Sequence, residues 1–315
     1  MSIRRRPPAD GAPAAPPPLP HQVRPWRALI ALMRPGHWLK NSFVLVGLIY
    51  GHFWNQPALL GAIALVFAAF CLAASSVYCF NDWADAEADR RHTRKSRRPV
   101  AGGMLAPRAA LWLAAGLAIA ALAVAWAVGW RPASVIGFYL ALNLAYSLRL
   151  KHFAVLDVLC IAAGFGARLL AGTWAVGIPP SSWLLICGLL FTLFLALGKR
   201  RAELADALDG ASAPGAARAA LAGYSLRALD WALTLSGALT LLAYGAYTLS
   251  PETRFAHGSA WLAATVPLVA LALGRYTLLI HIRRGGDDPA AAIWADAPLA
   301  LLCGAFAAAT LLILR

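Results

Sequence analysis

Charged residues are scarce in this sequence. Asp, Glu, Lys and Arg make up 13% of its 315 residues, whereas they make up about a quarter of a soluble domain. Hydrophobic residues reach 60%, and the mean hydropathy is +0.64. The sequence has only five cysteines and seven histidines, and their spacing matches neither a zinc site nor a redox pair. These shortages exclude an ordinary soluble domain and leave no basis for a zinc protein.

Long apolar runs take up most of the chain. A run of about 20 apolar residues satisfies its own backbone hydrogen bonds as a helix and matches the thickness of a bilayer. We therefore predict an all-α polytopic membrane protein with nine spans. Their ranges are 41–57, 59–80, 108–128, 133–148, 154–176, 182–198, 229–249, 259–280 and 298–314.

Lys and Arg outnumber Asp and Glu by 28 to 14, which gives a net charge of +14. Such an excess could indicate nucleic-acid binding, but its distribution favours membrane topology instead. With a cytoplasmic N-terminus, 24 of the 28 Lys and Arg residues fall on the cytoplasmic side of the nine spans. The positive-inside rule then predicts an inner-membrane protein with its C-terminus outside and with no nucleic-acid partner.

The first 23 residues differ from the rest of the chain. They contain three consecutive arginines and seven prolines but no apolar core, so they predict a disordered cytoplasmic tail rather than a signal peptide. Residues 24–315 then form one membrane domain. Its two main cytoplasmic loops are predicted at 81–107 and 199–228.

The first of these loops concentrates acidic residues. Residues 81–89 hold Asn81, Asp82, Asp85 and Asp89 directly after the second span. If the helix continues, the step of about 100° per residue places the three aspartates within about 60° of one another on one face. Carboxylates gathered in this way repel unless a cation lies between them, and Mg²⁺ prefers oxygen ligands and commonly bridges to phosphates. We expect a magnesium–diphosphate site at these three carboxylates.

A basic run follows immediately. It includes Arg90, Lys95 and Arg98 and ends at Pro99 and a Gly-Gly pair. Fixed cations beside a metal–carboxylate cluster can neutralise the phosphate oxygens that the metal does not reach. The alternative is a positive-inside loop whose acids form surface salt bridges of about 0–1 kcal/mol each.

The pattern N-D-x-x-D-x-x-x-D in residues 81–89, followed by D-R-x-H-x-x-K-x-x-R-P in residues 89–99, resembles the UbiA-type superfamily of membrane prenyltransferases. The resemblance covers residues 34–300. It implies a nine-helix bundle with a cytoplasm-facing active-site cavity. It also implies that Asn81, Asp82, Asp85 and Asp89 serve a Mg²⁺–diphosphate site.

Within this superfamily the sequence departs from aromatic prenyltransferases. Ordinary members carry a second D-x-x-x-D motif, whereas the corresponding region here offers Asp157 alone. Arg168 follows eleven residues later, within about 20° of Asp157 around the fifth span. Charges inside a span usually face a cavity and serve function. The alternatives are a pair that only supports helix packing, or a transport pathway through the protein.

Further motifs resemble the decaprenyl-phosphate phosphoribosyltransferase branch. They lie at residues 34–41, 146–151, 157–172, 198–204, 274–276 and 286–289. The side chains that they add as candidate substrate contacts are Lys40, Tyr146, Lys151, Arg168, Lys199, Arg200 and Arg201. Taken singly, Lys40 could be a snorkelling interfacial residue, and residues 199–201 a stop-transfer cluster.

That branch implies transfer of a 5-phosphoribosyl group from phosphoribosyl diphosphate to a polyprenyl phosphate. Asp82, Asp85 and Asp157 are the expected catalytic residues. Lys40 is assigned to the lipid phosphate and residues 199–201 to the 5-phosphate of the donor, although these two assignments could be exchanged. The alternative reaction is aromatic or tetrapyrrole prenyl transfer from a prenyl diphosphate. The sequence leaves open whether the chain forms a homo-oligomer.

Overall fold

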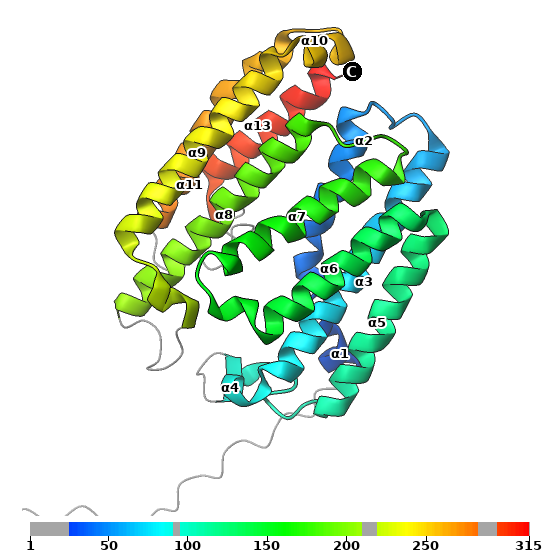
Figure 1. Cartoon of the computed structure of the whole chain (residues 1–315), viewed down its shortest axis with the longest axis vertical. Coiled ribbons are helices and arrows are strands. Elements are labelled where there is room, and N and C mark those ends of the chain that lie inside the picture. The colour runs from blue at the N-terminus through cyan, green and yellow to red at the C-terminus, as the bar shows by residue number, and fades with distance from the viewer. Residues whose placement is uncertain (1–24, 91–94, 210–218, 283–294, 315) are drawn as a thin grey trace, which may run out of the picture.

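In a computed structural model, the chain forms a bundle of helices (Figure 1). The structure describes residues 25–90, 95–209, 219–282 and 295–314, and these contain no strand. The predicted tail at 1–23 lies outside the described residues. The first half of the bundle consists of α1 (Pro25–Met33), η1 (Pro35–Leu45), α2 (Val46–Tyr50), α3 (Pro57–Ala84), α4 (Ala86–Arg90), η2 (Lys95–Arg97), α5 (Pro107–Val128), α6 (Trp130–Leu148), η3 (Leu150–His152) and α7 (Leu156–Ala175). The second half consists of α8 (Ser182–Leu208), η4 (Ala219–Gly223), α9 (Leu226–Leu249), α10 (Pro251–His257), η5 (Trp261–Thr265), α11 (Val266–Ile282) and α13 (Ala297–Ile313).

Six helical segments of the described chain are long and apolar enough to cross a membrane. They are α3, α5, α7, α8, α9 and the continuous η5–α11 segment. The multi-pass helical architecture is thereby confirmed, while the number of nine spans stays a prediction. Of the other three predicted spans, α6 is a 19-residue helix that is less apolar, and α13 has only 17 residues. The span predicted at 41–57 is divided between η1, α2 and a turn.

The two segments predicted as loops contain more helix than expected. Residues 199–208 continue α8 without a break, because good helix formers such as Ala, Leu, Glu and Arg dominate this stretch. In the segment 81–107, α3 runs to Ala84 and α4 follows after the single residue Asp85.

The irregular first span packs against α7 without side chains in between. A Cβ atom built on Gly172 of α7 would lie 2.1 Å from the carbonyl oxygen of Val44 in η1, and one built on Gly47 would lie 3.1 Å from Thr173. Only glycine permits this approach of two backbones. The 3-10 geometry of η1 is thus held by contact with the rest of the bundle.

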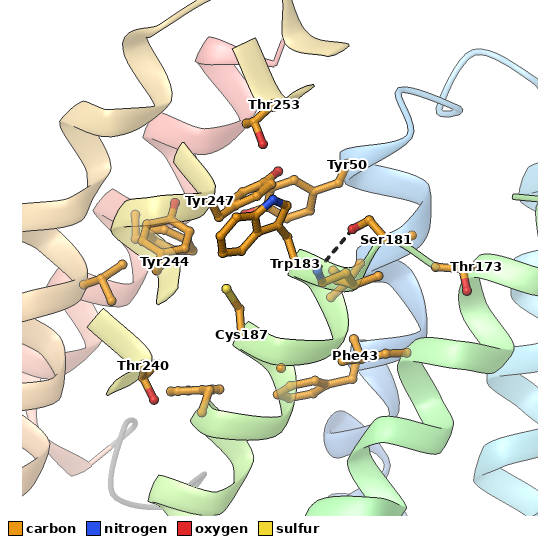
Figure 2. A pocket seen from close by; sticks show the side chains of 18 of the residues that line it. Phe43, Tyr50, Thr173, Ser181, Trp183, Cys187, Thr240, Tyr244, Tyr247 and Thr253 are labelled. Carbon is orange, nitrogen blue, oxygen red and sulfur yellow. Dashed lines mark hydrogen bonds between the residues drawn. The ribbon is translucent and has the colours of Figure 1, made fainter. Parts of the chain in front are cut away.

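The buried side chains form two main cores. One core joins η1, α3, α5, α6 and α7, and the other joins α8, α9, α11 and α13. An apolar cavity of 540 Å³ lies between α2, α7 and the helices of the second core (Figure 2). The end of the bundle that carries α1 and α4 is called here the Asp-rich end, and the opposite end, with α10 and the C-terminus, the far end (Figure 1).

A chain of hydrogen bonds connects the two halves at the far end. Nε2 of His52, just after α2, lies 2.8 Å from Nδ1 of His257 on α10. Nε2 of His257 lies 3.2 Å from the Tyr247 hydroxyl group on α9. Burial, and then the neighbouring His52, lower the pKa of His257 below its ordinary value of 6.5. The folded state therefore favours the neutral form of the His257 imidazole.

We predict that this pair stabilises the fold only above mildly acidic pH. Because the folded state lowers the pKa of His257, the stabilisation is complete above about pH 6.5 and is lost as the pH falls through the folded-state value. At pH 8, His257→Ala should cost about 1 kcal/mol, a fall of about 2 °C in melting temperature in detergent. The difference from wild type should close toward pH 5. His152→Ala, an exposed control on η3, should show no such trend, and a difference that stays constant from pH 8 to 5 would contradict this prediction.

Candidate active site at the Asp-rich end

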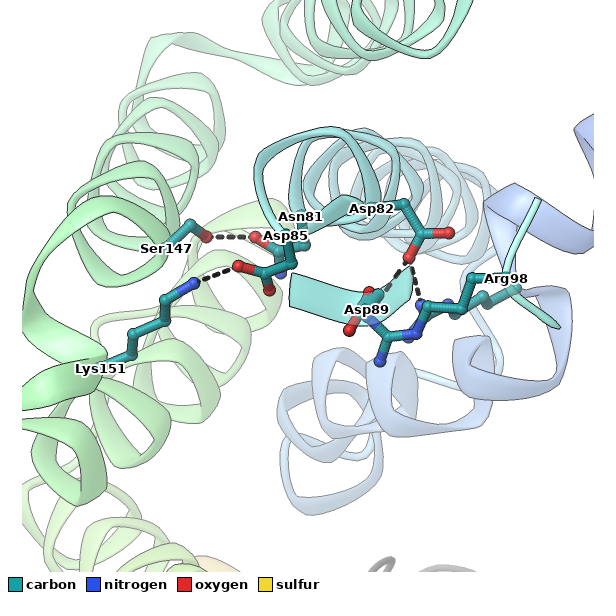
Figure 3. Close-up of polar contacts among 8 residues, drawn as sticks. Asn81, Asp82, Asp85, Asp89, Arg98, Ser147 and Lys151 are labelled. Carbon is teal, nitrogen blue, oxygen red and sulfur yellow. Dashed lines mark hydrogen bonds and ion pairs between the residues drawn. The ribbon is translucent and has the colours of Figure 1, made fainter. Parts of the chain in front are cut away.

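The acidic residues lie where α3 gives way to α4. Asp85 caps α3, and its backbone N–H donates to the Asn81 carbonyl oxygen at 2.9 Å. The Asp89 N–H donates to the Asp85 carbonyl oxygen at 2.8 Å, so the helical path almost continues. Asp82 and Asp89 are buried and Asp85 is half-buried. The side chains lie between Arg98 on one side and Lys151 and Ser147 on the other (Figure 3).

Asp82 and Asp89 share the guanidinium of Arg98, and Asp82 also contacts that of Arg34. An Arg34 nitrogen, NH2, donates to Asp82 Oδ1 at 2.6 Å. NH1 of Arg98 donates to Asp89 Oδ2 at 2.6 Å and lies 3.7 Å from Asp82 Oδ1. The structure therefore brings these two acids together around Arg98, as the shared helical face predicts.

Asp85 turns toward the end of α6. Lys151 of η3 donates from Nζ to Asp85 Oδ1 at 2.5 Å. The Ser147 hydroxyl, one turn earlier at the end of α6, lies within hydrogen-bond distance of Asn81 Oδ1 and of the Asn143 carbonyl oxygen, and its one proton serves either acceptor. These contacts fix Asn81 and Asp85 against α6, away from Arg98.

The donor set fits a hard divalent cation. Asn81 and the three aspartates offer only oxygen atoms, which Mg²⁺ prefers. Oδ2 of Asp82 is buried and accepts no hydrogen bond from any described residue, which leaves one ligand atom available. In the described part of the chain no three acids, histidines or cysteines already stand close enough to hold a metal, because each aspartate contacts a basic side chain instead. A metal bound here therefore shares these carboxylates with the basic side chains or displaces them.

A second polar cluster surrounds Asp157 at the start of α7. Arg200 of α8 places Nε 2.5 Å from Asp157 Oδ2, and both side chains are almost completely buried. The Tyr224 hydroxyl donates to Asp157 Oδ1 at 2.7 Å and accepts from the Val155 N–H. Burial and the hydrogen bond to Asp157 raise the pKa of Tyr224 to about 12. The Tyr224 hydroxyl therefore keeps its proton at neutral pH and donates it to Asp157, whose other carboxylate oxygen lies beside the Arg200 guanidinium.

The other basic residues of this cluster differ in their contacts. Arg200 NH1 also pairs with Glu203, and Lys199 Nζ lies 3.9 Å from the same carboxylate. Arg201 instead donates to Asp230 of α9 at 3.0 Å and to the Ile280 carbonyl oxygen. Arg200 and Arg201 are thus held by protein partners, and their predicted role as phosphate contacts stays a prediction.

The end of α6 joins the two clusters. Tyr146 accepts a hydrogen bond from Arg200 NH2 at 3.3 Å, while the next residue, Ser147, binds Asn81. The structure therefore brings Tyr146, Lys151, Asp157 and Arg200 to the same end of the bundle as the acidic residues.

Arg168 lies deeper in the bundle, and among the described residues its guanidinium forms no ion pair with a carboxylate. Its Nε donates to Asn41 Oδ1 at 2.8 Å, NH1 to the Gly164 carbonyl oxygen at 2.7 Å and NH2 to the Tyr139 hydroxyl at 3.2 Å. Its guanidinium lies about 5 Å from the ring centroids of Phe70, Tyr139 and Phe165. Eleven residues of helix separate it from Asp157, a rise of about 16 Å. Its contacts support helix packing, and substrate binding by Arg168 stays a prediction.

The remaining predicted contacts lie at the margin of the site. Lys40 Nζ lies 3.3 Å from His37 Nδ1, Arg90 is exposed at the end of α4, and Lys95 is half-buried in η2. Residues 91–94 and the motif at 286–289 lie outside the described residues.

Four residues of the clusters were not predicted as site residues: Arg34, Ser147, Glu203 and Tyr224. Arg34, Ser147 and Glu203 lie within motifs that the sequence does single out, at 34–41, 146–151 and 198–204. Tyr224 carries no signal, because 67 residues separate it from Asp157.

Comparison with known proteins identifies relatives along most of the chain. The model of the UbiA prenyltransferase family matches residues 41–302. Over 261 residues, the chain is 36% identical to a decaprenyl-phosphate phosphoribosyltransferase of Mycolicibacterium smegmatis, which covers 79% of this chain and 81% of that protein. Over 189 residues it is 34% identical to the nodulation protein NoeC of Azorhizobium caulinodans, covering 57% and 60% of the two chains.

The fold also has solved counterparts. A UbiA homolog from Archaeoglobus fulgidus, in a structure bound to GPP and Mg²⁺, superposes with a TM-score of 0.69. The identity is 18%, and the match covers 91% of this chain and 99% of that one. At this identity the match establishes the arrangement of helices.

The burial of the Asp157–Arg200 pair predicts a large structural effect. Asp157→Asn should cost about 2 kcal/mol, because it leaves Arg200 buried with Glu203 as its remaining acid. The apparent melting temperature in detergent should fall by about 5 °C. Asp85→Asn, which breaks the more exposed pair with Lys151, should cost less than about 1 kcal/mol. Equal melting temperatures for Asp157→Asn and wild type would show that the pair contributes nothing to stability.

Proposed function

The chain belongs to the UbiA prenyltransferase family, and from this membership we propose that it transfers the 5-phosphoribosyl group of phosphoribosyl diphosphate to a polyprenyl phosphate of the decaprenyl type. The observation that carries the proposal is the acidic segment flanked by Arg98 and Lys151, at the same end as a second basic cluster on α8. The 36% identity to a decaprenyl-phosphate phosphoribosyltransferase supports this choice of substrates.

The proposed reaction makes one bond and breaks one. A phosphate oxygen of the lipid attacks C1 of the ribose, the bond from C1 to the diphosphate oxygen breaks, and pyrophosphate leaves with the bonding electrons. The nucleophile is an anion near neutral pH, so the protein needs no strong general base. It must instead hold two anionic substrates together and stabilise the departing charge.

The acidic segment serves the departing diphosphate in this proposal. Asn81, Asp82, Asp85 and Asp89 are the ligands for Mg²⁺, which when bound supplies positive charge to the diphosphate oxygens. Arg98 and Lys151 contact Asp89 and Asp85 at 2.6 and 2.5 Å. Once these acids turn to a metal, both cations lie within reach of the diphosphate and can neutralise it. Arg90 and Lys95 add positive charge at the rim.

Two groups of cations remain for the other phosphates. Lys199, beside Glu203 on the cytoplasmic end of α8, is our candidate for the 5-phosphate of the donor, with Arg200 and Arg201 holding the helix in position. Lys40, which directly precedes the first predicted span, is the candidate for the lipid phosphate. Asp157 orients Arg200 and Tyr224, and through Arg200 it positions Tyr146.

The apolar cavity suits the polyprenyl chain. It extends from Phe43 and Phe191 in the bundle interior to Tyr50, Tyr247 and α10 at the far end (Figure 2). We place the first part of the lipid chain in it, while an opening of the cavity toward the Asp-rich end stays a prediction. The proposal also keeps nine spans, with the Asp-rich end in the cytoplasm, the C-terminus outside, and an inner-membrane location.

The reaction product is a polyprenyl-linked phosphoribose. We place it upstream of a lipid-linked arabinose donor, as the branch implies. The final acceptor would be cell-wall arabinan or a secreted glycolipid, and the similarity to a nodulation protein supports keeping the second.

A direct assay distinguishes this reaction from prenyl transfer. Purified protein with Mg²⁺, decaprenyl phosphate and phosphoribosyl diphosphate labelled in the ribose should give labelled lipid and pyrophosphate in equal amounts. A parallel reaction supplies a prenyl diphosphate with an aromatic acceptor. Product in the second reaction and none in the first would assign the chain to aromatic prenyl transfer instead.

The acidic ligands can be tested individually. Asp82→Asn and Asp85→Asn should each lower turnover by more than about 100-fold, since loss of outer metal contacts alone costs 10–100-fold. Glu87→Gln is the matched control, because Glu87 is an exposed acid of the same segment. It should retain wild-type turnover. Full activity in both aspartate variants would remove the metal site from this segment.

A further inference from the structure

Arg34 has an unfavourable backbone conformation at the entrance of the first span. Its φ of 52° and ψ of 60° are left-handed, which L-residues with a Cβ atom rarely adopt. The conformation is imposed from both sides. On one side, α1 is fixed because Ala28 and Leu32 are buried, Leu32 in a small apolar cluster with side chains of α3, α4 and α5. On the other side, Pro35 begins η1. Strained residues of this kind cluster at active sites, ligand clamps and switch regions.

The side chain of Arg34 is held against Asp82. NH2 lies 2.6 Å from Asp82 Oδ1, and the guanidinium lies 4.9 Å from the ring centroid of Tyr78, one turn earlier on α3. The Asp82 side chain is 0% exposed, whereas that of Arg34 is 24% exposed. Arg98 contacts Asp89 closely and stands 3.7 Å from Asp82. Arg34 is thus the main counter-ion of Asp82, and it is also the partner with room to move.

A metal at Asp82 and the guanidinium of Arg34 compete for the same carboxylate. Two cations cannot both bind Asp82 Oδ1 at hydrogen-bond distance without strong repulsion. Oδ2 of Asp82 is open to a metal, but a metal there stands beside the guanidinium on Oδ1 and repels it, so a metal that binds alone weakens the Arg34–Asp82 pair and leaves the guanidinium short of an anion. A diphosphate that arrives with the metal supplies such an anion, and its oxygens match the donor fork of an arginine.

We infer that Arg34 is an exchangeable cation that makes metal and diphosphate bind as a pair: it occupies Asp82 in the absence of metal and moves to the diphosphate when metal binds. The inference rests on the proposed metal–diphosphate site at Asp82. It assigns to the site a weak affinity for free metal and a strong coupling between the two ligands. It also predicts that metal and pyrophosphate leave together after transfer.

Metal binding can be measured without turnover. Mn²⁺ titrations followed by electron paramagnetic resonance, on the purified full chain, report metal affinity with and without pyrophosphate, after correction for Mn²⁺ bound by pyrophosphate in solution. In wild type, pyrophosphate should tighten Mn²⁺ binding. In Arg34→Gln, Mn²⁺ alone should bind about tenfold more tightly, and the effect of pyrophosphate should shrink about tenfold.

Three variants control for folding and for net charge. Arg34→Gly also removes the guanidinium, and glycine suits the left-handed backbone. This variant should therefore fold at least as well as Arg34→Gln and bind Mn²⁺ with the same increased affinity. Arg34→Lys retains the charge and should keep the weak affinity for free metal. Arg27→Gln on α1 makes the same change in net charge, and since Arg27 stacks over Trp26 at 5.2 Å it should leave both affinities unchanged.

The outcomes separate the inference from the proposed function. If wild type binds Mn²⁺ but Arg34→Gln and Arg34→Gly bind it equally or more weakly, the exchange is wrong and the metal site stands. If wild type binds no Mn²⁺ even with pyrophosphate, and Asp82→Asn behaves identically, the metal site itself is wrong and the inference falls with it.

Discussion

Repulsion among Asp82, Asp85 and Asp89 is the constraint on which the Asp-rich end depends. Carboxylates this close in sequence can share the end of one helix only if cations stand between them. In the structure, these cations come from three separate segments: Arg34 between α1 and η1, Arg98 after η2, and Lys151 in η3. Charge balance therefore requires three segments to pack around the end of α3: the start of the first span, the segment after α4 and the residues that follow α6.

The position of Arg34 depends in turn on a contact far from the acids. The irregular helix η1 is held to α7 by the close approach at Gly172 and by the hydrogen bond from Arg168 to Asn41. Arg168 is itself fixed by Gly164 and Tyr139 and by three aromatic rings, so its charge is stabilised inside the bundle without a carboxylate. Arg168, which lies about 16 Å along α7 from Asp157, thus fixes the start of the first span.

Much of this arrangement follows from the sequence, and the exceptions have physical reasons. Apolar length predicts the six clear spans, and helical periodicity places Asp82 beside Asp89. Periodicity could not show that Asp85 turns to Lys151, because that depends on where α6 ends in space. It also placed Asp157 and Arg168 on one stripe of α7, but it could not show their partners, which come from α8, η1, α6 and the residue after η4. Contacts between distant segments, such as Tyr224 with Asp157, leave no local pattern.

The charged clusters and the apolar cavity lie in different parts of the bundle, and this limits where the two substrates can meet. The cavity is lined almost entirely by apolar and aromatic side chains, and Phe43 on its wall packs on Phe165, which in turn covers the Arg168 guanidinium. A phosphate inside that cavity would lose its hydration without gaining a cation, which is prohibitive in a low-dielectric interior. In the proposed reaction, the lipid can therefore enter the cavity with its hydrocarbon chain only. Its phosphate must stay at the Asp-rich end, where a water-soluble donor also arrives, so attack on C1 is confined to the boundary between the cavity and the charged clusters.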